Sequence, residues 1–241
     1  MEHVVKSSFD TSEIKSRIRS SYNQIAHTYL KWSAPYRDLS HSLVKQYIIP
    51  YLGSISSPTA LELGCGAGIP TTKSLSEVIN IKVTANDIST TQIGLAKQNL
   101  PQEKLDFVEG DMMALRFPEA SFDTVLAMYS ITHLPREEQA VMIVRIASWL
   151  KLGGLFLCSF PGESSETIVE GDWLEKGAWM YWSSWGKDGS LCKVKESGLQ
   201  VVMEKIIGDE GGGDENTSKP MFLWVVARKG ADDSNKEQAD L

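Results

Sequence analysis

Cysteine is scarce in this 241-residue sequence, which contains only Cys65, Cys158 and Cys192, and no two of them are spaced as Cys-x-x-Cys. An odd and scattered set of this kind argues against a disulfide framework and against a zinc site. We therefore expect a reducing, cytoplasmic setting and no bound metal.

Long apolar runs and clusters of positive charge are missing as well. No apolar run approaches the roughly 18 residues needed to cross a bilayer. The first ten residues, MEHVVKSSFD, contain no basic stretch followed by an apolar one, so they predict no secretory signal. The 31 acidic residues outnumber the 24 basic ones, for a formal net charge of −7. Because long nucleic acid is held through its phosphates by basic stripes, we expect neither a membrane nor a nucleic acid partner.

What the sequence does contain is enough apolar material for one large core, with 42% hydrophobic residues. After residue 11, apolar side chains recur at steps of four, four, three and four, which predicts an amphipathic N-terminal helix. These positions are Ile14, Ile18, Tyr22, Ile25 and Tyr29. A second helix is predicted over residues 39–47.

Beyond residue 58, short apolar segments alternate with longer helical ones. The predicted strands are 59–63, 82–86, 105–109, 124–128 and 155–160, and the predicted helices between them are 71–78, 90–100 and 136–150. Such alternation implies right-handed crossovers and a parallel sheet covered on both faces. The fold class is therefore α/β, with a doubly wound, Rossmann-like sheet.

The last third of the chain departs from this alternation. Residues 201–207 and 221–227 are two strand-like runs that we expect to pair as an antiparallel hairpin at the edge of the sheet. The glycine-rich, acidic connection 208–220 and the polar tail 230–241 lack any periodicity, so both are predicted to be mobile or disordered.

A glycine turn follows the first predicted strand, in the sequence ELGCGAG of residues 62–68. Glycines allow tight backbone conformations and the close approach of a ligand, and the free N–H groups of a following helix attract electronegative atoms. The dinucleotide fingerprint requires a third glycine at position 69, where this chain has Ile69, so NAD and FAD are disfavoured. The alternative is a tight turn needed only for packing.

Two acidic residues follow the next two strands. Asp87 ends the second strand, where a carboxylate can accept hydrogen bonds from both hydroxyls of a ribose. Asp111 follows the third strand, where it could accept an exocyclic amine while Met112 packs against a base. An ordinary helix cap or a solvated aspartate is the alternative for Asp87. Together the three strand ends predict an adenosine site.

The same segments resemble a known family, the class I S-adenosylmethionine-dependent methyltransferases of the small-molecule type. The resemblance rests on ELGCGAG, ANDIS, VEGDM, FPEASFDTVLAMYSITHLP and KLGGLFLCSF, in that order and spacing, and covers about residues 22–229. It implies a mostly parallel seven-stranded sheet with an antiparallel terminal strand. It also implies a division into an N-terminal helical lid (1–52), a core (53–229) with an insertion (161–190), and a disordered tail (230–241).

The resemblance assigns roles to individual residues of a bound S-adenosylmethionine site. Asp87 would bind the ribose hydroxyls and Asp111 with Met112 the adenine. The amino acid part of the cofactor would be held by Glu62 and the glycine turn, and further contacts would come from the lid and from two strand ends. The first set is Glu62, Gly64, Gly66 and Gly68. The second set is Tyr22, Tyr29, Ile88 and Met128.

Methyl transfer from a sulfonium is a displacement in which alignment and the exclusion of water matter most. A neutral acceptor also needs a base, and the candidates are His133, after the fourth strand, and Tyr22 on the lid. The alternative for His133 is that its imidazole only bonds the backbone or the cofactor carboxylate.

Aromatic residues concentrate in the insertion after the fifth strand, at the edge where open α/β sheets bind ligands. Trp173, Trp179, Tyr181 and Trp182 are predicted to wall the acceptor site, because such rings bury planar or apolar groups. They could instead cover the sheet edge or form a dimer patch.

The sequence thus predicts an enzyme that transfers a methyl group from S-adenosylmethionine to an O, N or S atom of a small molecule, in natural-product or intermediary metabolism. S-adenosylhomocysteine would be the product, and the chain a monomer or homodimer. A protein that binds the cofactor without turnover, acting as an interaction partner or sensor, is the alternative. An NAD-dependent enzyme is a weaker one.

Overall fold

The computed structural model describes residues 9–101, 103–208 and 220–230. Most of the predicted mobile loop, at 209–219, and of the predicted tail, at 231–241, lies outside the described residues.

One seven-stranded sheet organises the fold, with the strand order β3-β2-β1-β4-β5-β9-β8. Its first five strands are parallel, and β9 lies antiparallel between β5 and β8. The strands are β1 (Thr59–Leu63), β2 (Lys82–Asp87), β3 (Leu105–Glu109), β4 (Phe122–Ala127), β5 (Leu150–Pro161), β8 (Leu199–Gly208) and β9 (Met221–Lys229). This confirms the predicted doubly wound sheet and the antiparallel hairpin at its edge.

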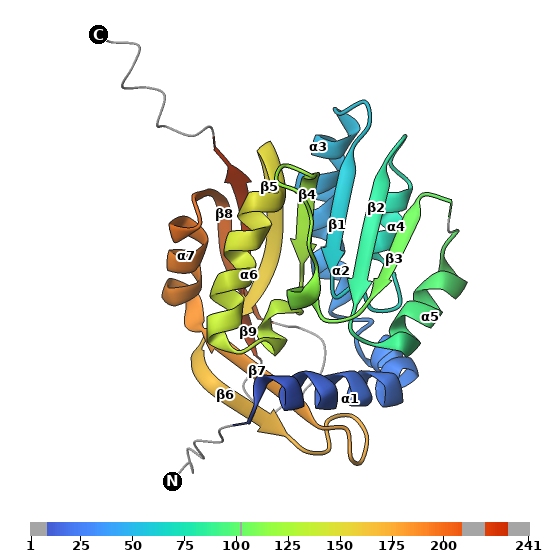
Figure 1. Cartoon of the computed structure of the whole chain (residues 1–241), viewed down its shortest axis with the longest axis vertical. Helices are drawn as coiled ribbons and strands as arrows, with labels where there is room; N and C mark the ends of the chain where they lie inside the picture. Colours follow the sequence, from blue (N-terminus) through green and yellow to red (C-terminus); the bar gives the residue numbers. More distant parts are fainter. Residues whose placement is uncertain (1–8, 102, 209–219, 231–241) are drawn as a thin grey trace.

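Helices cover both faces of this sheet (Figure 1). They are α1 (Thr11–Trp32), α2 (Arg37–Leu43), α3 (Ile49–Gly53), α4 (Thr71–Ser76), α5 (Thr90–Asn99), α6 (Arg136–Trp149) and α7 (Gly186–Glu196), with a π-helical turn at Val44–Ile48 and 3₁₀ turns at Met112–Ala114 and Ile131–His133. The helix predicted at 39–47 continues to residue 53, and α7 was not predicted. In the described part of the chain, no helix has the length and apolar character to span a membrane.

Alternating side chains divide the core between the two faces of the sheet. On one face, Phe156 and Val225 pack with residues of α6 and α7 such as Ile143. On the other, Leu157 and Trp224 pack with residues from α2 through α4. Both faces of β4 and β5 are buried, which explains their continuous apolar sequence.

The aromatic insertion forms a small sheet of its own. β6 (Ser164–Glu170) and β7 (Met180–Trp185) pair antiparallel with each other and with no strand of the main sheet. Sequence analysis identified this insertion by its tryptophans but did not predict its strands. Three tryptophans within seven residues obscured the alternation.

Helix α1 lies across one end of the main sheet, next to β6 and β7 (Figure 1). The Ser21 hydroxyl donates to the Trp179 carbonyl at 2.7 Å, and the Asn23 side-chain oxygen accepts from the Ser89 hydroxyl at 2.7 Å and from the Thr91 N–H at 3.1 Å. The helix is thereby attached both to the insertion and to the start of α5.

The opposite end of the sheet is held by a buried carboxylate. One oxygen of Asp123, in β4, accepts hydrogen bonds from the N–H and the hydroxyl of Thr59, each at 2.8 Å, and from the Lys151 ammonium at 2.7 Å. The starts of β1, β4 and β5 are therefore joined at one atom.

We predict that Asp123→Ala lowers the free energy of unfolding by about 1–3 kcal/mol, because it removes the acceptor of the partly buried Thr59 N–H, whereas the Thr59 hydroxyl keeps the Ser121 carbonyl. Lys151→Ala, which removes the partly exposed cation, should cost less than about 1 kcal/mol. Urea unfolding of both variants tests this. Equal losses would mean that the ion pair, not the Thr59 bonds, carries the stabilisation.

Candidate active site

The glycine turn after β1 is shaped by the neighbouring strand. The N–H groups of Gly64 and Cys65 both donate to the Asn86 carbonyl at 2.8 Å. Gly64, Gly66 and Gly68 have φ values of 77°, 54° and 77°, in the left-handed region. A Cβ on Gly64 would lie 2.5 Å from the Ser130 Cβ. Glycine is therefore needed here for backbone conformation and for packing.

Asp87, at the end of β2, is buried with 8% exposure and holds this turn. Its carboxylate accepts from the Gly66 N–H and from the Ser89 N–H, each at 2.9 Å. Burial raises the pKa of Asp87 to about 6, although these N–H bonds oppose the shift. Ser89 caps α5 by accepting from the Gln92 N–H at 3.1 Å, so Ser89, and not Asp87, is the cap of this helix.

Glu62, in β1, is a second buried carboxyl group beneath the turn. Its side chain accepts a hydrogen bond from the Thr72 hydroxyl at 2.6 Å. Burial raises the pKa of Glu62 to about 8; the Thr72 bond opposes this shift and the nearby Asp87 charge adds to it. The group is therefore poised to ionise when a cation lies beside it.

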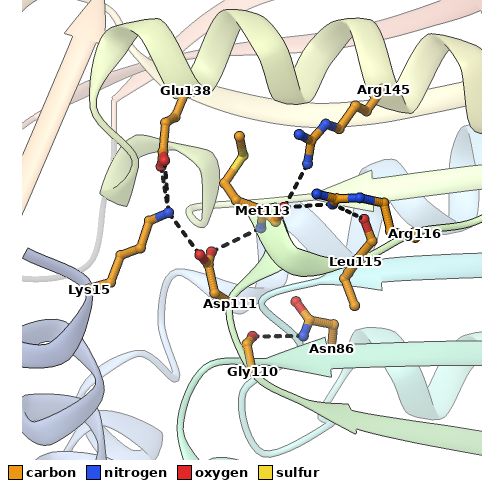
Figure 2. Close-up of polar contacts among 9 residues, drawn as sticks. All are labelled: Lys15, Asn86, Gly110, Asp111, Met113, Leu115, Arg116, Glu138 and Arg145. Carbon is orange, nitrogen blue, oxygen red and sulfur yellow. Dashed lines mark hydrogen bonds and ion pairs between the residues drawn. The ribbon is translucent and has the colours of Figure 1, made fainter. Parts of the chain in front are cut away.

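Asp111, after β3, is already paired in this structure. Figure 2 shows its carboxylate between the Met113 N–H, at 2.9 Å, and the Lys15 ammonium of α1, at 2.8 Å. Lys15 also contacts Glu138, at the start of α6, at 2.8 Å. Burial lowers the pKa of Lys15, but the hydrogen bonds to the two carboxylates and their negative charges together outweigh it and raise the pKa above its ordinary value.

Two adjoining cavities open at this edge of the sheet beneath α1. The smaller, of about 80 Å³, is lined at the ends of β2 and β3 by Asp87, Ile88, Asp111, Met112 and Lys15. The larger, of about 470 Å³, is lined by Glu62, Trp32, Tyr36, Arg37, Trp173, Trp182 and Phe222. Eight residues line both: Tyr22, Tyr29, Gly64, Gly66, Gln92, Met128, Tyr129 and His133.

Tyr22 and His133 meet where the cavities join. The Nδ1 of His133 lies 2.8 Å from the Tyr181 carbonyl, and its Nε2 lies 2.8 Å from the Tyr22 hydroxyl. Because a carbonyl only accepts, Nδ1 carries the proton, and the neutral Nε2 accepts from Tyr22. Burial lowers the pKa of His133 to about 4, although the Tyr181 bond opposes this. Burial, together with Tyr29 and Asp87, raises the pKa of Tyr22.

The predicted aromatic wall divides into two pairs. Trp173 and Trp182 line the larger cavity, and their ring centroids lie 5.5 Å apart. Trp179 instead packs against Phe9 and beneath the Arg17 guanidinium, and Tyr181 is buried with its hydroxyl on the Glu166 carbonyl. Neither of these two lines either cavity.

Other predicted residues are likewise separated by the structure. Gly68 lies outside both cavities, where a Cβ would fall 2.6 Å from Leu100.

Four residues that line the cavities were not predicted from the sequence: Lys15, Trp32, Tyr36 and Arg37. The signal for Lys15 was present, because it shares a helical face with Ile18 and Tyr22 at steps of three and four.

Comparison with known proteins matches part of this chain to methyltransferases. Residues 60–154 match the sequence pattern of the family described as methyltransferase domain. Demethylmenaquinone methyltransferase from Lactococcus lactis is 30% identical over 149 residues, which cover 60% of this chain and 58% of that protein. Over these segments the chain is similar to known methyltransferases.

Other methyltransferases match this chain more narrowly or by fold alone. A sterol 24-C-methyltransferase from Gibberella zeae is 33% identical over 117 residues, 46% of this chain and 30% of that protein. The chain thus spans between about a third and three fifths of these relatives. The structure of 1,6-didemethyltoxoflavin N1-methyltransferase from Burkholderia thailandensis, with 1,6-didemethyltoxoflavin and S-adenosylhomocysteine bound, has a TM-score of 0.69 at 19% identity, over 95% of this chain and 94% of that one.

We predict that His133 stays neutral, with its proton on Nδ1, from pH 8 down to about pH 5. Its folded-state pKa lies below the ordinary value, so the imidazole takes up a proton only as the pH approaches about 4. Nitrogen-15 NMR of the ring nitrogens, assigned by comparison with His133→Gln, measures this directly. A titration of the His133 ring near pH 6.5 would contradict its burial between Tyr22 and the Tyr181 carbonyl.

Proposed function

We propose that this protein binds S-adenosylmethionine and transfers its methyl group to a small-molecule acceptor, releasing S-adenosylhomocysteine. The observation that carries the proposal is the junction of two cavities. One is lined by the strand-end acids and the other by aromatic rings, with Tyr22 and His133 where they meet.

The strand ends offer a partner for each part of the cofactor. Asp87 is proposed to accept from the ribose hydroxyls, and Asp111 from the adenine amine with Met112 beside the ring. Glu62 and the glycine turn would hold the amino acid part. The ammonium group of that part would favour the ionised form of Glu62, so binding at neutral pH should release a proton from this residue.

The aromatic cavity would align the acceptor and keep water away. Loss of the sulfonium charge requires little electrostatic help, so positioning is the main contribution. An acceptor N–H or O–H placed against the Tyr22 oxygen could pass its proton along the hydrogen bond to Nε2 of His133, while the Tyr181 carbonyl orients the ring. The bond between His133 and that carbonyl also supports the purely structural alternative.

The acceptor class follows from the cavity and from the relatives. Aromatic walls suit a planar or apolar small molecule, and the relatives are named for demethylmenaquinone, sterol and 1,6-didemethyltoxoflavin methylation. The methylated atom, O, N or S, is left open, as is the pathway in natural-product or intermediary metabolism.

We further propose the division into a lid (1–52), a core (53–229) with the insertion 161–190, and a tail (230–241). The protein would be a cytoplasmic monomer or homodimer without a nucleic acid partner.

A non-catalytic binder of the same cofactor remains the second candidate. It is favoured by the low pKa of His133, which makes the imidazole a weak base in the resting site. An NAD enzyme is disfavoured because Ile69 stands where the dinucleotide fingerprint has glycine.

Calorimetry tests the cofactor proposal. We expect binding of S-adenosylmethionine and S-adenosylhomocysteine but not of NAD, and Asp87→Ala should weaken binding by more than about tenfold, through loss of the ribose bonds and of the turn that Asp87 holds. The measured heat should also depend on the ionisation enthalpy of the buffer, and Glu62→Gln should remove that dependence. Binding of NAD alone, or an unchanged Kd in Asp87→Ala, would overturn the assignment.

The acceptor is tested with a screen of metabolite extracts and methyl-labelled cofactor. For the acceptor found, Trp182→Ala should raise KM by about tenfold or more, because it removes a ring of the cavity wall, with the cofactor Kd changed less than about twofold. Trp179→Ala is the matched control and should leave KM unchanged. Equal effects of both variants would argue against an acceptor wall at Trp182, and absence of any labelled product would favour the non-catalytic binder.

A further inference from the structure

The contact of Lys15 with Asp111 and Glu138 joins three segments that are far apart in the sequence (Figure 2). Lys15 belongs to α1, Asp111 follows β3, and Glu138 lies in the first turn of α6. The Lys15 side chain is 16% exposed, and the two carboxylates are 26% and 24% exposed. This ion triad is therefore much less screened by solvent than a surface pair.

The Asp111 side of the triad is a rigid anchor. The Met113 N–H donates to one Asp111 oxygen, and the Met113 carbonyl accepts from Arg145 at 2.6 Å and from Arg116 at 2.9 Å (Figure 2). The Asn86 side chain donates to the Gly110 carbonyl at 2.9 Å, which fixes the preceding residue. The loop after β3 is thus held from both sides where Lys15 contacts it.

The Lys15 side of the triad lies on the face of α1 that roofs the smaller cavity. Lys15, Ile18, Tyr22 and Tyr29 all line it, and Lys15 occupies the end beside Asp111. Each carboxylate oxygen of Asp111 receives one hydrogen bond, so each retains a lone pair for another donor. Lys15 and an adenine amine can therefore share Asp111.

We propose that Lys15 is a positioning residue that holds α1 closed over the adenine end of the cofactor cavity by bridging Asp111 and Glu138. The inference rests on the proposed cofactor site. Without the Lys15 cation, two carboxylates face the same space uncompensated, which disfavours the closed position of α1. The time for which the cofactor stays bound thus depends on a residue outside the motif segments, and on Glu138, which lines neither cavity.

The test measures the dissociation rate of radiolabelled S-adenosylhomocysteine, chased with excess unlabelled ligand, from the full chain. Lys15→Met and Glu138→Gln should each speed dissociation by about tenfold, because truncating one member of a partly buried charge pair acts mainly on the off-rate. The double variant should be no faster than Lys15→Met, since both changes break one bridge. Lys15→Arg should retain most of the slow dissociation.

Glu13→Gln is the matched control, because Glu13 pairs with Arg17 on the solvent side of the same helix. Its dissociation rate should equal that of the wild type. Thermal unfolding without ligand is measured for every variant. A lower Tm with an unchanged dissociation rate, or an effect of Lys15→Met that Glu138→Gln does not share, overturns the bridge. A wild-type chain that binds no S-adenosylhomocysteine instead refutes the proposed function itself.

Discussion

The carboxylate of Asp87 is the contact on which the site depends. Its two oxygens accept the N–H groups of Gly66 and Ser89, so one side chain fixes the glycine turn after β1 and the start of α5. The cost is burial of a charge beside Glu62, and both carboxyl groups have pKa values raised by burial. The site therefore stores unfavourable electrostatics, which ligand hydroxyls and a cationic group can relieve.

The roof of the site is built from two segments that depend on one another. Helix α1 supplies Tyr22 and Tyr29, the β6–β7 insertion supplies Trp173, and the rings of Trp173 and the two tyrosines are in contact. Backbone carbonyls of the insertion accept from Ser21 and Gln24 of the same helix. Movement of α1 must therefore change the smaller and the larger cavity together.

Local patterns predicted the main sheet and its helices because each strand and helix carries its own periodicity. The glycine turn, Asp87 and Asp111 were found because strand ends of a parallel sheet converge on one edge. Lys15 was overlooked although its helical spacing with Ile18 and Tyr22 places it on the same face of α1. Trp182 lies in β7 and Trp179 immediately before it, so their separation depends on a strand that the tryptophan-rich sequence did not reveal.

Because β6 and β7 pair with each other and not with the main sheet, fastening the main sheet and walling the aromatic cavity fall to different sheets. The core is fastened at the amino ends of β1, β4 and β5 through Asp123, on the far side from the aromatic cavity. Exchange of the small hairpin would leave that fastening intact. It would still alter the roof of the site, because the carbonyls of Trp179 and Tyr181 hold Ser21 of α1 and the His133 ring.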